Sequence, residues 1–341
     1  MNLKEPTFSE QLRVLADTSA GSIEVLPLPM LSSVVAQKQT SDTVALQPSQ
    51  FSGSIVTDWR ISSFSSLTRD IHQAPHSGSS AASSDPIINF TAGSHVGLFL
   101  HKILEELDFQ GDIAAQTIAL NQRHAPHYGF DAERQQETVV TWLQHIVNTP
   151  LNEAGLMLSQ LSRHRRLDEL QFDFAIDKVS VTSLNHVVGE WAGVTLSPVS
   201  VEDFRGMITG IIDLVFEHRG RYYIADYKSN YLGSALADYA PEQLRQAIFD
   251  RRYDLQYLLY VLALHRYLRQ RLRDYDYNQH MGGVYYLFLR GMRPATGPRY
   301  GVHHDLPPHA LIDELDSRVL GYQSSRDTST AQSQSDKGES A

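Results

Sequence analysis

Two apolar segments separated by a short charged turn constrain the fold of this chain more than any other feature. Residues 210–216 and 222–228 are rich in isoleucine, leucine, valine, phenylalanine and tyrosine, which is typical of strands buried on both faces of a sheet. Arg219 and Gly220 stand midway between the two segments, where the central residues of a tight turn are expected. The pattern therefore predicts a β-hairpin that pairs symmetrically about these two residues.

Two aspartates interrupt the apolar segments. The symmetric register places His218 opposite Arg221 and, further out, Asp213 opposite Asp226. Lys228 projects on the same face as Asp226 because side chains alternate along a strand. Opposed like charges destabilise a hairpin, and carboxylates seldom lie in such strands without a partner. Two converging carboxylates are suitable ligands for a hard cation such as Mg²⁺, so the pattern predicts a metal site beside the lysine.

Two alternatives remain at this point of the argument. The hairpin can be a solvated one whose charges are scattered on a wet face. A three-residue loop with a bulge would also shift the register by one residue and separate the two aspartates.

Several ordered segments resemble the RecB family of nuclease domains, within the PD-(D/E)xK nuclease superfamily. The resemblance extends from about Trp59 to about Met292, and its segments are residues 97–109, 210–230, 253–268 and 282–291. It implies an α/β fold, a restriction-endonuclease-like core with a mixed central β-sheet flanked by helices.

The resemblance also implies roles for single residues. It implies metal ligands at His101, Asp213 and Asp226. It implies catalytic groups at Asp213, Asp226, Lys228 and Glu169, with Glu169 as an auxiliary glutamate. Gln256 and Tyr260 match the Gln-x-x-x-Tyr motif, which is expected to position DNA beside the metal.

The residues outside the hairpin have structural interpretations as well. His101 falls near the edge of the apolar face of a helix, which is typical of a boundary residue. Tyr260 lies in a helix that is mostly core, and Glu169 in an arginine-rich segment where an exposed acid is ordinary. The hairpin aspartates with Lys228 therefore carry the functional hypothesis on their own chemistry.

This hypothesis is a metal-dependent DNA nuclease that hydrolyses phosphodiester bonds. The expected cofactor is Mg²⁺, with Mn²⁺ as an alternative because of the histidine ligand, and with Ca²⁺ binding without supporting turnover. The resemblance implies the nuclease part of a RecBCD-type helicase–nuclease, of the exodeoxyribonuclease V type, acting in double-strand break repair and recombination. Implied partners are single-stranded DNA from unwound duplex, RecC-like and RecD-like subunits and a RecA-type recombinase.

Composition sets limits on this hypothesis. The 341 residues include no cysteine, which excludes disulfides and an iron–sulfur cluster and is consistent with the cytoplasm. No signal peptide or membrane-spanning run is expected, and no Walker motif for ATP binding occurs. The 29 basic and 39 acidic residues give a net charge of −10, which argues against strong DNA binding by this chain alone. Delivery of DNA by partner subunits would reconcile the charge with the activity.

The pattern along the chain divides it into four regions. We expect a remnant of a preceding helicase region at 1–30 with a helix at 8–16, a linker at 31–55, the nuclease domain at 56–323 and a disordered tail at 324–341. A flexible insertion is expected at 75–86. Predicted helices lie at 94–109, 112–122, 131–147, 150–162 and within 241–273, and strands begin near Leu170 and recur at 282–290.

Two other functional classes compete with a RecB-like nuclease. One is a noncatalytic DNA-binding or subunit-docking module that keeps the nuclease fold, although the presence of both aspartates and the lysine favours an enzyme. The other is a stand-alone restriction-type endonuclease, which would cut specific sequences as a dimer.

Overall fold

The computed structural model describes residues 7–27, 53, 59–68, 83–199 and 201–320. Its contacts divide the chain into two units, residues 1–55 and 56–341. The predicted linker lies outside the described residues except for Gly53, and so do the predicted tail and residues 75–82 of the predicted insertion. Among the described residues, no helix has both the length and the apolar character needed to cross a lipid bilayer.

The first unit contains α1, which spans Phe8–Thr18. It begins with a capping box, because the Thr7 backbone N–H donates to the Glu10 carboxylate at 2.6 Å. The helix predicted at residues 8–16 is therefore confirmed, with two further residues at its C-terminal end.

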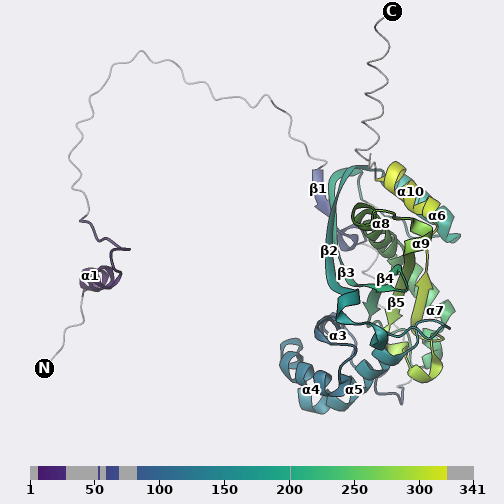
Figure 1. Ribbon diagram of the computed structural model, residues 1–341, viewed down its shortest axis with the longest axis horizontal. Coiled ribbons are helices and arrows are strands. Elements are labelled where there is room, and N and C mark those ends of the chain that lie inside the picture. Colours follow the sequence, from purple (N-terminus) through teal and green to yellow (C-terminus); the bar gives the residue numbers. More distant parts are fainter. Residues whose placement is uncertain (1–6, 28–52, 54–58, 69–82, 200, 321–341) are drawn as a thin grey trace, which may run out of the picture. The chain divides into compact units, whose positions relative to one another are not determined.

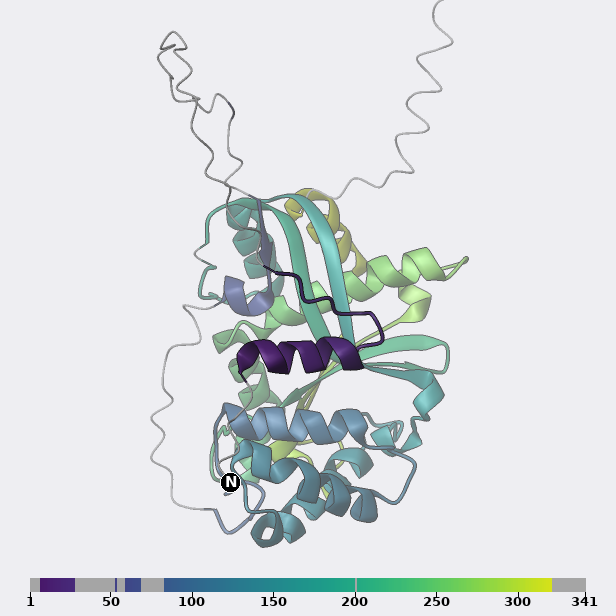
Figure 2. The same ribbon diagram turned by 90° about the vertical axis from the view of Figure 1, so that its left-hand side faces the viewer.

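The second unit is built on a mixed β-sheet. Its strands among the described residues are β1 (Trp59–Ser62), β2 (Arg166–Val179), β3 (Phe204–His218), β4 (Arg221–Lys228), β5 (Met281–Phe288) and β6 (Val302–Asp305). The order is β1-β3-β4-β5-β6, and β2 pairs with β3. The β1–β3 and β4–β5 pairs are parallel and the others antiparallel, which confirms the predicted mixed sheet. Figure 2 shows β2 and β3 as two long teal strands side by side.

Helices cover both faces of this sheet. They are α2 (Phe64–Leu67), α3 (Ser94–Glu106), α4 (Ile113–His124), α5 (Ala132–Asn148), α6 (Val181–Ala192), α7 (Pro241–Asp250), α8 (Tyr253–Arg271), α9 (Tyr277–His280) and α10 (His309–Glu314). One core packs α3, α4 and α5 against the sheet, and a second core packs α6, α7, α8 and α10. Figure 1 shows these two groups of helices apart from one another. The predicted α/β core flanked by helices is confirmed.

Two sequence expectations about the elements were wrong. Residues 150–162 do not form a helix, and a single 3₁₀ turn at Leu158–Gln160 lies there instead. Pro150 and Gly155 explain this, since proline favours an extended residue before it and Gly155 adopts a left-handed φ of 79°. The first long strand begins at Arg166 rather than near Leu170, so it includes the arginine-rich segment.

Candidate active site

Five of the predicted residues converge where β2, β3 and β4 meet, and we call them the sheet site. They are His101, Glu169, Asp213, Asp226 and Lys228. Asp213, Asp226 and Lys228 come from the β3–β4 hairpin, whereas His101 comes from α3 and Glu169 from β2, so long-range packing brings the last two to the hairpin.

The hairpin adopts the predicted register. Arg219 and Gly220 have φ angles of 52° and 78°, as a two-residue turn of the I′ type requires, and His218 pairs with Arg221. The backbone ladder of β3 and β4 ends at Leu214 and Ala225, one residue before the two aspartates.

Asp213 replaces the next backbone contact of this ladder with its side chain. Its Oδ2 accepts a hydrogen bond from the Tyr227 backbone N–H at 2.8 Å. Its other oxygen, Oδ1, lies 3.4 Å from Nδ1 of His101. Burial acts to raise the pKa of Asp213, but His101, Lys228 and the hydrogen bond from Tyr227 together outweigh it and hold that pKa below its ordinary value. Asp213 is therefore held as a carboxylate.

His101 reaches the sheet from α3. Its Nε2 lies 2.8 Å from the Tyr227 carbonyl oxygen, which can only accept, so Nε2–H donates and Nδ1 faces Asp213. Burial alone would lower the pKa of His101, but the Asp213 carboxylate outweighs it and raises the pKa to about 9. This orientation is the one that metal-bound histidines commonly have, with the outer N–H on a carbonyl group.

Asp226 and Lys228 form a buried ion pair. Lys228 Nζ lies 2.5 Å from Asp226 Oδ1, and Asp226 is 2% exposed. Burial raises the pKa of Asp226 to about 6 even though the ammonium of Lys228 acts in the opposite direction. Burial acts to lower the pKa of Lys228, but Asp226 outweighs it and raises that pKa. The lysine therefore remains a cation.

Gln256 on α8 connects the lysine to the predicted DNA-binding motif. Its Oε1 accepts from Lys228 Nζ at 2.9 Å and from the Tyr286 hydroxyl at 2.8 Å. Its Nε2 donates to the Tyr260 hydroxyl at 2.9 Å. Lys228 Nζ also lies 4.2 Å from the centre of the Tyr253 ring, within range of a cation–π contact.

Sequence reasoning assigned no role to Tyr253 and Tyr286. Both lie in segments that carried the family resemblance, but tyrosine in an apolar helix or strand is an ordinary core residue. Their contacts with Lys228 and Gln256 depend on the packing of α8 over β4 and β5, which no local pattern reveals.

Glu169 occupies a strained position opposite Asp213. The β2–β3 register pairs Asp168 with Leu214 and Leu170 with Ile212, so Glu169 stands at the level of Asp213. Its φ is 52°, in the left-handed region that costs an ordinary residue about 1–2 kcal/mol. Such strain is concentrated at functional sites. Burial and the Asp213 charge raise the pKa of Glu169 to about 7.

The strand β3 changes the face it presents at Asp213. Alternate residues of a regular strand share a face, so Ile212 and Leu214 would be expected on the same side. Instead Ile212 belongs to the core under α8, and Leu214 belongs to the core under α3, α4 and α5. Asp213 can therefore contact groups from both sides of the sheet.

The neighbouring strand β2 makes the same change. Phe174 packs in the core under α8, whereas the guanidinium of Arg166 stacks on Phe109 in the opposite core at 3.6 Å from the ring centre. Both residues have even numbers, so an irregularity must lie between them, and the left-handed Glu169 supplies it. The strain at Glu169 and the position of Asp213 thus belong to one distortion of the sheet.

The donor set fits a divalent cation. His101, Glu169 and Asp213 each offer one ligand atom within 4.8 Å of the others. Asp226 is not in this three-residue group, although the sequence predicted it as a ligand, and Glu169 stands there instead. Burial and the charge of Asp213 raise the pKa values of Glu169 and Asp226, and the carboxylate of Asp213 raises that of His101, so these groups hold protons that a bound metal ion can replace.

A hollow lies beside Gln256 and Tyr260. Its volume is about 380 Å³, and its lining includes Phe172 and residues 208–211 of β3. That part of β3 lies beyond the ladder with β1, which ends at Ile208, and before the ladder with β4. A Cβ at Gly210 would lie 2.5 Å from the Phe172 ring, so glycine leaves room for that ring to lie over β3.

Comparison with known proteins identifies the family. The family model described as the PD-(D/E)XK nuclease superfamily matches residues 85–335. The chain belongs to this superfamily. The resemblance inferred from the sequence is therefore confirmed.

Curated relatives carry the name RecBCD enzyme subunit RecB. The Escherichia coli K12 protein is 37% identical over 281 residues, which cover 77% of this chain and 23% of the relative. The Haemophilus influenzae protein is 33% identical over 346 residues, covering 93% of this chain and 28% of the relative. The Mycobacterium tuberculosis H37Rv protein is 33% identical over 315 residues, which cover 76% of this chain and 28% of the relative. The chain spans about a quarter of the length of these relatives.

Proposed function

We propose that this protein is a metal-dependent deoxyribonuclease that hydrolyses phosphodiester bonds in DNA. The observation that carries the proposal is the convergence of Asp213, Asp226 and Lys228 with His101 and Glu169 at one distorted point of the sheet. Membership of a nuclease superfamily supports it. Buried carboxylates with raised pKa values beside a buried lysine are costly for stability, which is typical of functional sites.

The proposed cofactor is Mg²⁺, which when bound would polarise a phosphate and lower the pKa of a water molecule. Nδ1 of His101 and the carboxylates of Asp213 and Glu169 would hold the ion, with Asp226 beside them. The histidine also suits Mn²⁺, and Ca²⁺ is expected to bind without supporting cleavage.

Lys228 is proposed to act on the reacting phosphate. Its ammonium is held by Asp226 and by Gln256, so it is positioned before substrate arrives. Such a preorganised cation stabilises negative charge that develops on a phosphate during cleavage, or orients the attacking water. Gln256 and Tyr260 would contact the strand being cut, because the hollow of about 380 Å³ opens beside both.

We further propose that the protein works as the nuclease part, residues 56–323, of a RecBCD-type enzyme of the exodeoxyribonuclease V type. The names of the relatives support this proposal. RecC-like and RecD-like subunits would deliver single-stranded DNA, which accounts for a chain whose own net charge is −10. A role in double-strand break repair with a RecA-type recombinase, in the cytoplasm, follows from the same proposal.

A mutational assay tests the proposed active site. We expect Asp226→Ala and Lys228→Ala each to lower the rate of Mg²⁺-dependent degradation of single-stranded DNA by about 10²–10³-fold or more. Lys102→Ala is the matched control, because Lys102 lies next to His101 in sequence but pairs with Glu105 and Glu106 on the surface of α3. Full activity in either active-site variant would refute the assignment.

Two further measurements separate the competing classes. The first measurement is calorimetry with Mg²⁺ or Mn²⁺. The proposed enzyme should bind the ion at a site that Asp213→Asn removes, whereas a noncatalytic docking module should show no such site-specific binding. A restriction-type endonuclease should leave discrete fragments of plasmid DNA, whereas the proposed enzyme should give a continuous distribution of fragment lengths.

A further inference from the structure

A buried histidine on α8 has an unsatisfied ring nitrogen. His265 is 3% exposed, and its Nε2 has no hydrogen-bond partner among the described residues. Its other nitrogen, Nδ1, lies 3.0 Å from the Tyr275 hydroxyl. Buried polar atoms are almost always hydrogen-bonded, so a free nitrogen in the core calls for an explanation.

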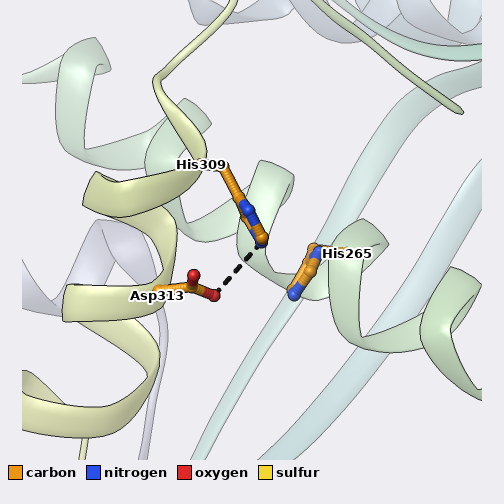
Figure 3. Close-up of side chains that lie close together, drawn as sticks. All are labelled: His265, His309 and Asp313. Carbon is orange, nitrogen blue, oxygen red and sulfur yellow. Dashed lines mark ion pairs between the residues drawn. The ribbon is translucent and has the colours of Figure 1, made fainter. Parts of the chain in front are cut away.

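Two residues of α10 lie near the His265 ring. His309 and Asp313 are one helical turn apart, and Nε2 of His309 is 3.3 Å from Oδ1 of Asp313. The His309 ring stacks on Tyr277, with ring centres 4.8 Å apart and planes 12° apart. Figure 3 shows the ring of His265 coming from α8 and turned toward the other two side chains. We call these three residues the α8–α10 cluster.

The spacing within the α8–α10 cluster suits a metal ion. Each of its three residues offers one ligand atom, and these atoms all lie within 4.8 Å of one another. Ligands about 2.0–2.1 Å from a tetrahedral ion are about 3.4 Å apart, which the His309–Asp313 distance of 3.3 Å already matches. The side chain of Asp313 is 54% exposed, so it is free to rotate toward His265.

We propose that His265, His309 and Asp313 form a second metal site, which takes a borderline transition-metal ion such as Zn²⁺. Two imidazoles and one carboxylate are a ligand set that Zn²⁺ prefers over Mg²⁺, which favours oxygen ligands and water. The contact of Nδ1 with Tyr275 supports this reading, because a ligating histidine usually donates its other N–H to an oxygen. Water would complete the coordination.

The charges around the cluster are compatible with a cation. Burial and the positive charge of Arg269 lower the pKa of His265 to about 4, so the ring is neutral at pH 7 and keeps its lone pair. The Arg269 charge is offset only in part, since its Nη2 lies 3.6 Å from Asp316 Oδ2. Arg266 pairs with the same carboxylate at 2.5 Å. The negative charge of Asp313 acts on His265 in the opposite direction to the two arginines.

Such an ion would join α10 to α8, the helix that carries Gln256 and Tyr260. Because the three ligands belong to two elements far apart in the sequence, binding stabilises only the folded chain. The site is therefore structural and lies apart from the sheet site.

Calorimetry with Zn²⁺ on the full, untagged chain tests this inference. The Asp213→Asn background removes competing binding at the sheet site. We expect one Zn²⁺ per chain and a rise of several degrees in the melting temperature when the ion is in large excess over its Kd. His309→Ala and Asp313→Asn should each weaken binding by at least about tenfold, and both residues are partly exposed, so both variants should fold.

His186→Ala is the matched control. His186 and Glu190 on α6 also form a histidine–acid pair one turn apart, at 3.5 Å, but both are largely exposed. We expect this variant to bind Zn²⁺ as tightly as the background. Three results would each overturn the proposal: no binding to the background, an equal loss in His186→Ala and His309→Ala, or a melting temperature that Zn²⁺ does not raise.

Discussion

The sheet site and the α8–α10 cluster bring ligand atoms together in different ways. The sheet site gathers three acidic residues beside a lysine and a histidine, and burial raises the pKa of two of those acids, Asp226 and Glu169. The α8–α10 cluster has one carboxylate and two imidazoles, and the Tyr277 ring contacts both imidazoles. The first therefore favours a hard, highly charged ion, and the second favours an ion that binds neutral nitrogen.

The two sites also differ in what they cost the fold. The sheet site depends on a strained residue, Glu169, and on a buried ion pair. None of the three residues of the α8–α10 cluster has a positive φ. This difference is expected if the first site performs chemistry and the second one stabilises the structure, because strain and shifted pKa values are retained where catalysis needs them.

The pH dependence of metal binding should separate the two sites most strongly. Glu169 and His101 have pKa values of about 7 and 9, and each must lose its proton to coordinate a metal, while the neighbouring Asp226 has a pKa of about 6. Affinity for Mn²⁺ at the sheet site should therefore rise between pH 6 and pH 8, by about 100-fold or more. Calorimetry of the wild-type chain and of Asp213→Asn at both pH values measures this rise.

At the α8–α10 cluster we expect a weaker dependence on pH. His265, with a pKa of about 4, is already neutral across this range. If Mn²⁺ binding to the sheet site and Zn²⁺ binding to the α8–α10 cluster depended equally on pH, the proposed difference between the two sets of ligands would be wrong.

One variant on α8 and one on α10 should each affect one site without the other. Gln256→Ala removes an acceptor from Lys228, and hydrogen bonds to charged groups contribute about 1.5–3 kcal/mol. We expect DNA cleavage to fall by roughly 10- to 100-fold while Zn²⁺ binding is unchanged. His309→Ala should weaken Zn²⁺ binding and leave DNA cleavage, measured without Zn²⁺, unchanged. Gln270→Ala, at an exposed position of the same helix, is the control and should change neither.

The smallest effect concerns the backbone strain at Glu169. Glu169→Gly should raise the free energy of unfolding by about 1 kcal/mol at pH 8, since glycine adopts its φ of 52° without a steric penalty. The gain should be smaller at pH 5. A carboxyl whose folded-state pKa is raised from 4.5 to about 7 destabilises the fold as pH rises through that window, and the variant removes this effect.

Urea denaturation at both pH values measures this gain. Glu169→Gln separates its two causes, because it removes the charge and keeps the strained backbone. Glu169→Gln should raise the free energy of unfolding at pH 8 but not at pH 5. A Glu169→Gly variant that is less stable than the wild type at pH 8 would show that φ is not a source of strain there.

Local patterns were sufficient for some parts of the fold. The hairpin register follows from the turn residues Arg219 and Gly220, and α1 from its capping residues, because both depend on neighbours a few positions away. The helix predicted at residues 150–162 was wrong, because Pro150 and Gly155 interrupt that segment. The domain boundaries and the roles of the site residues stay predictions.

The sequence by itself determined that Asp213, Asp226 and Lys228 would lie close together, since a tight turn and strand alternation define the position of each. Tertiary structure alone decided that Glu169 faces Asp213 in a strained conformation and that both strands change faces there. It alone also placed His265 beside His309 and Asp313. The physical reason is that these positions depend on packing between distant segments, whose free energy is not encoded in any short pattern.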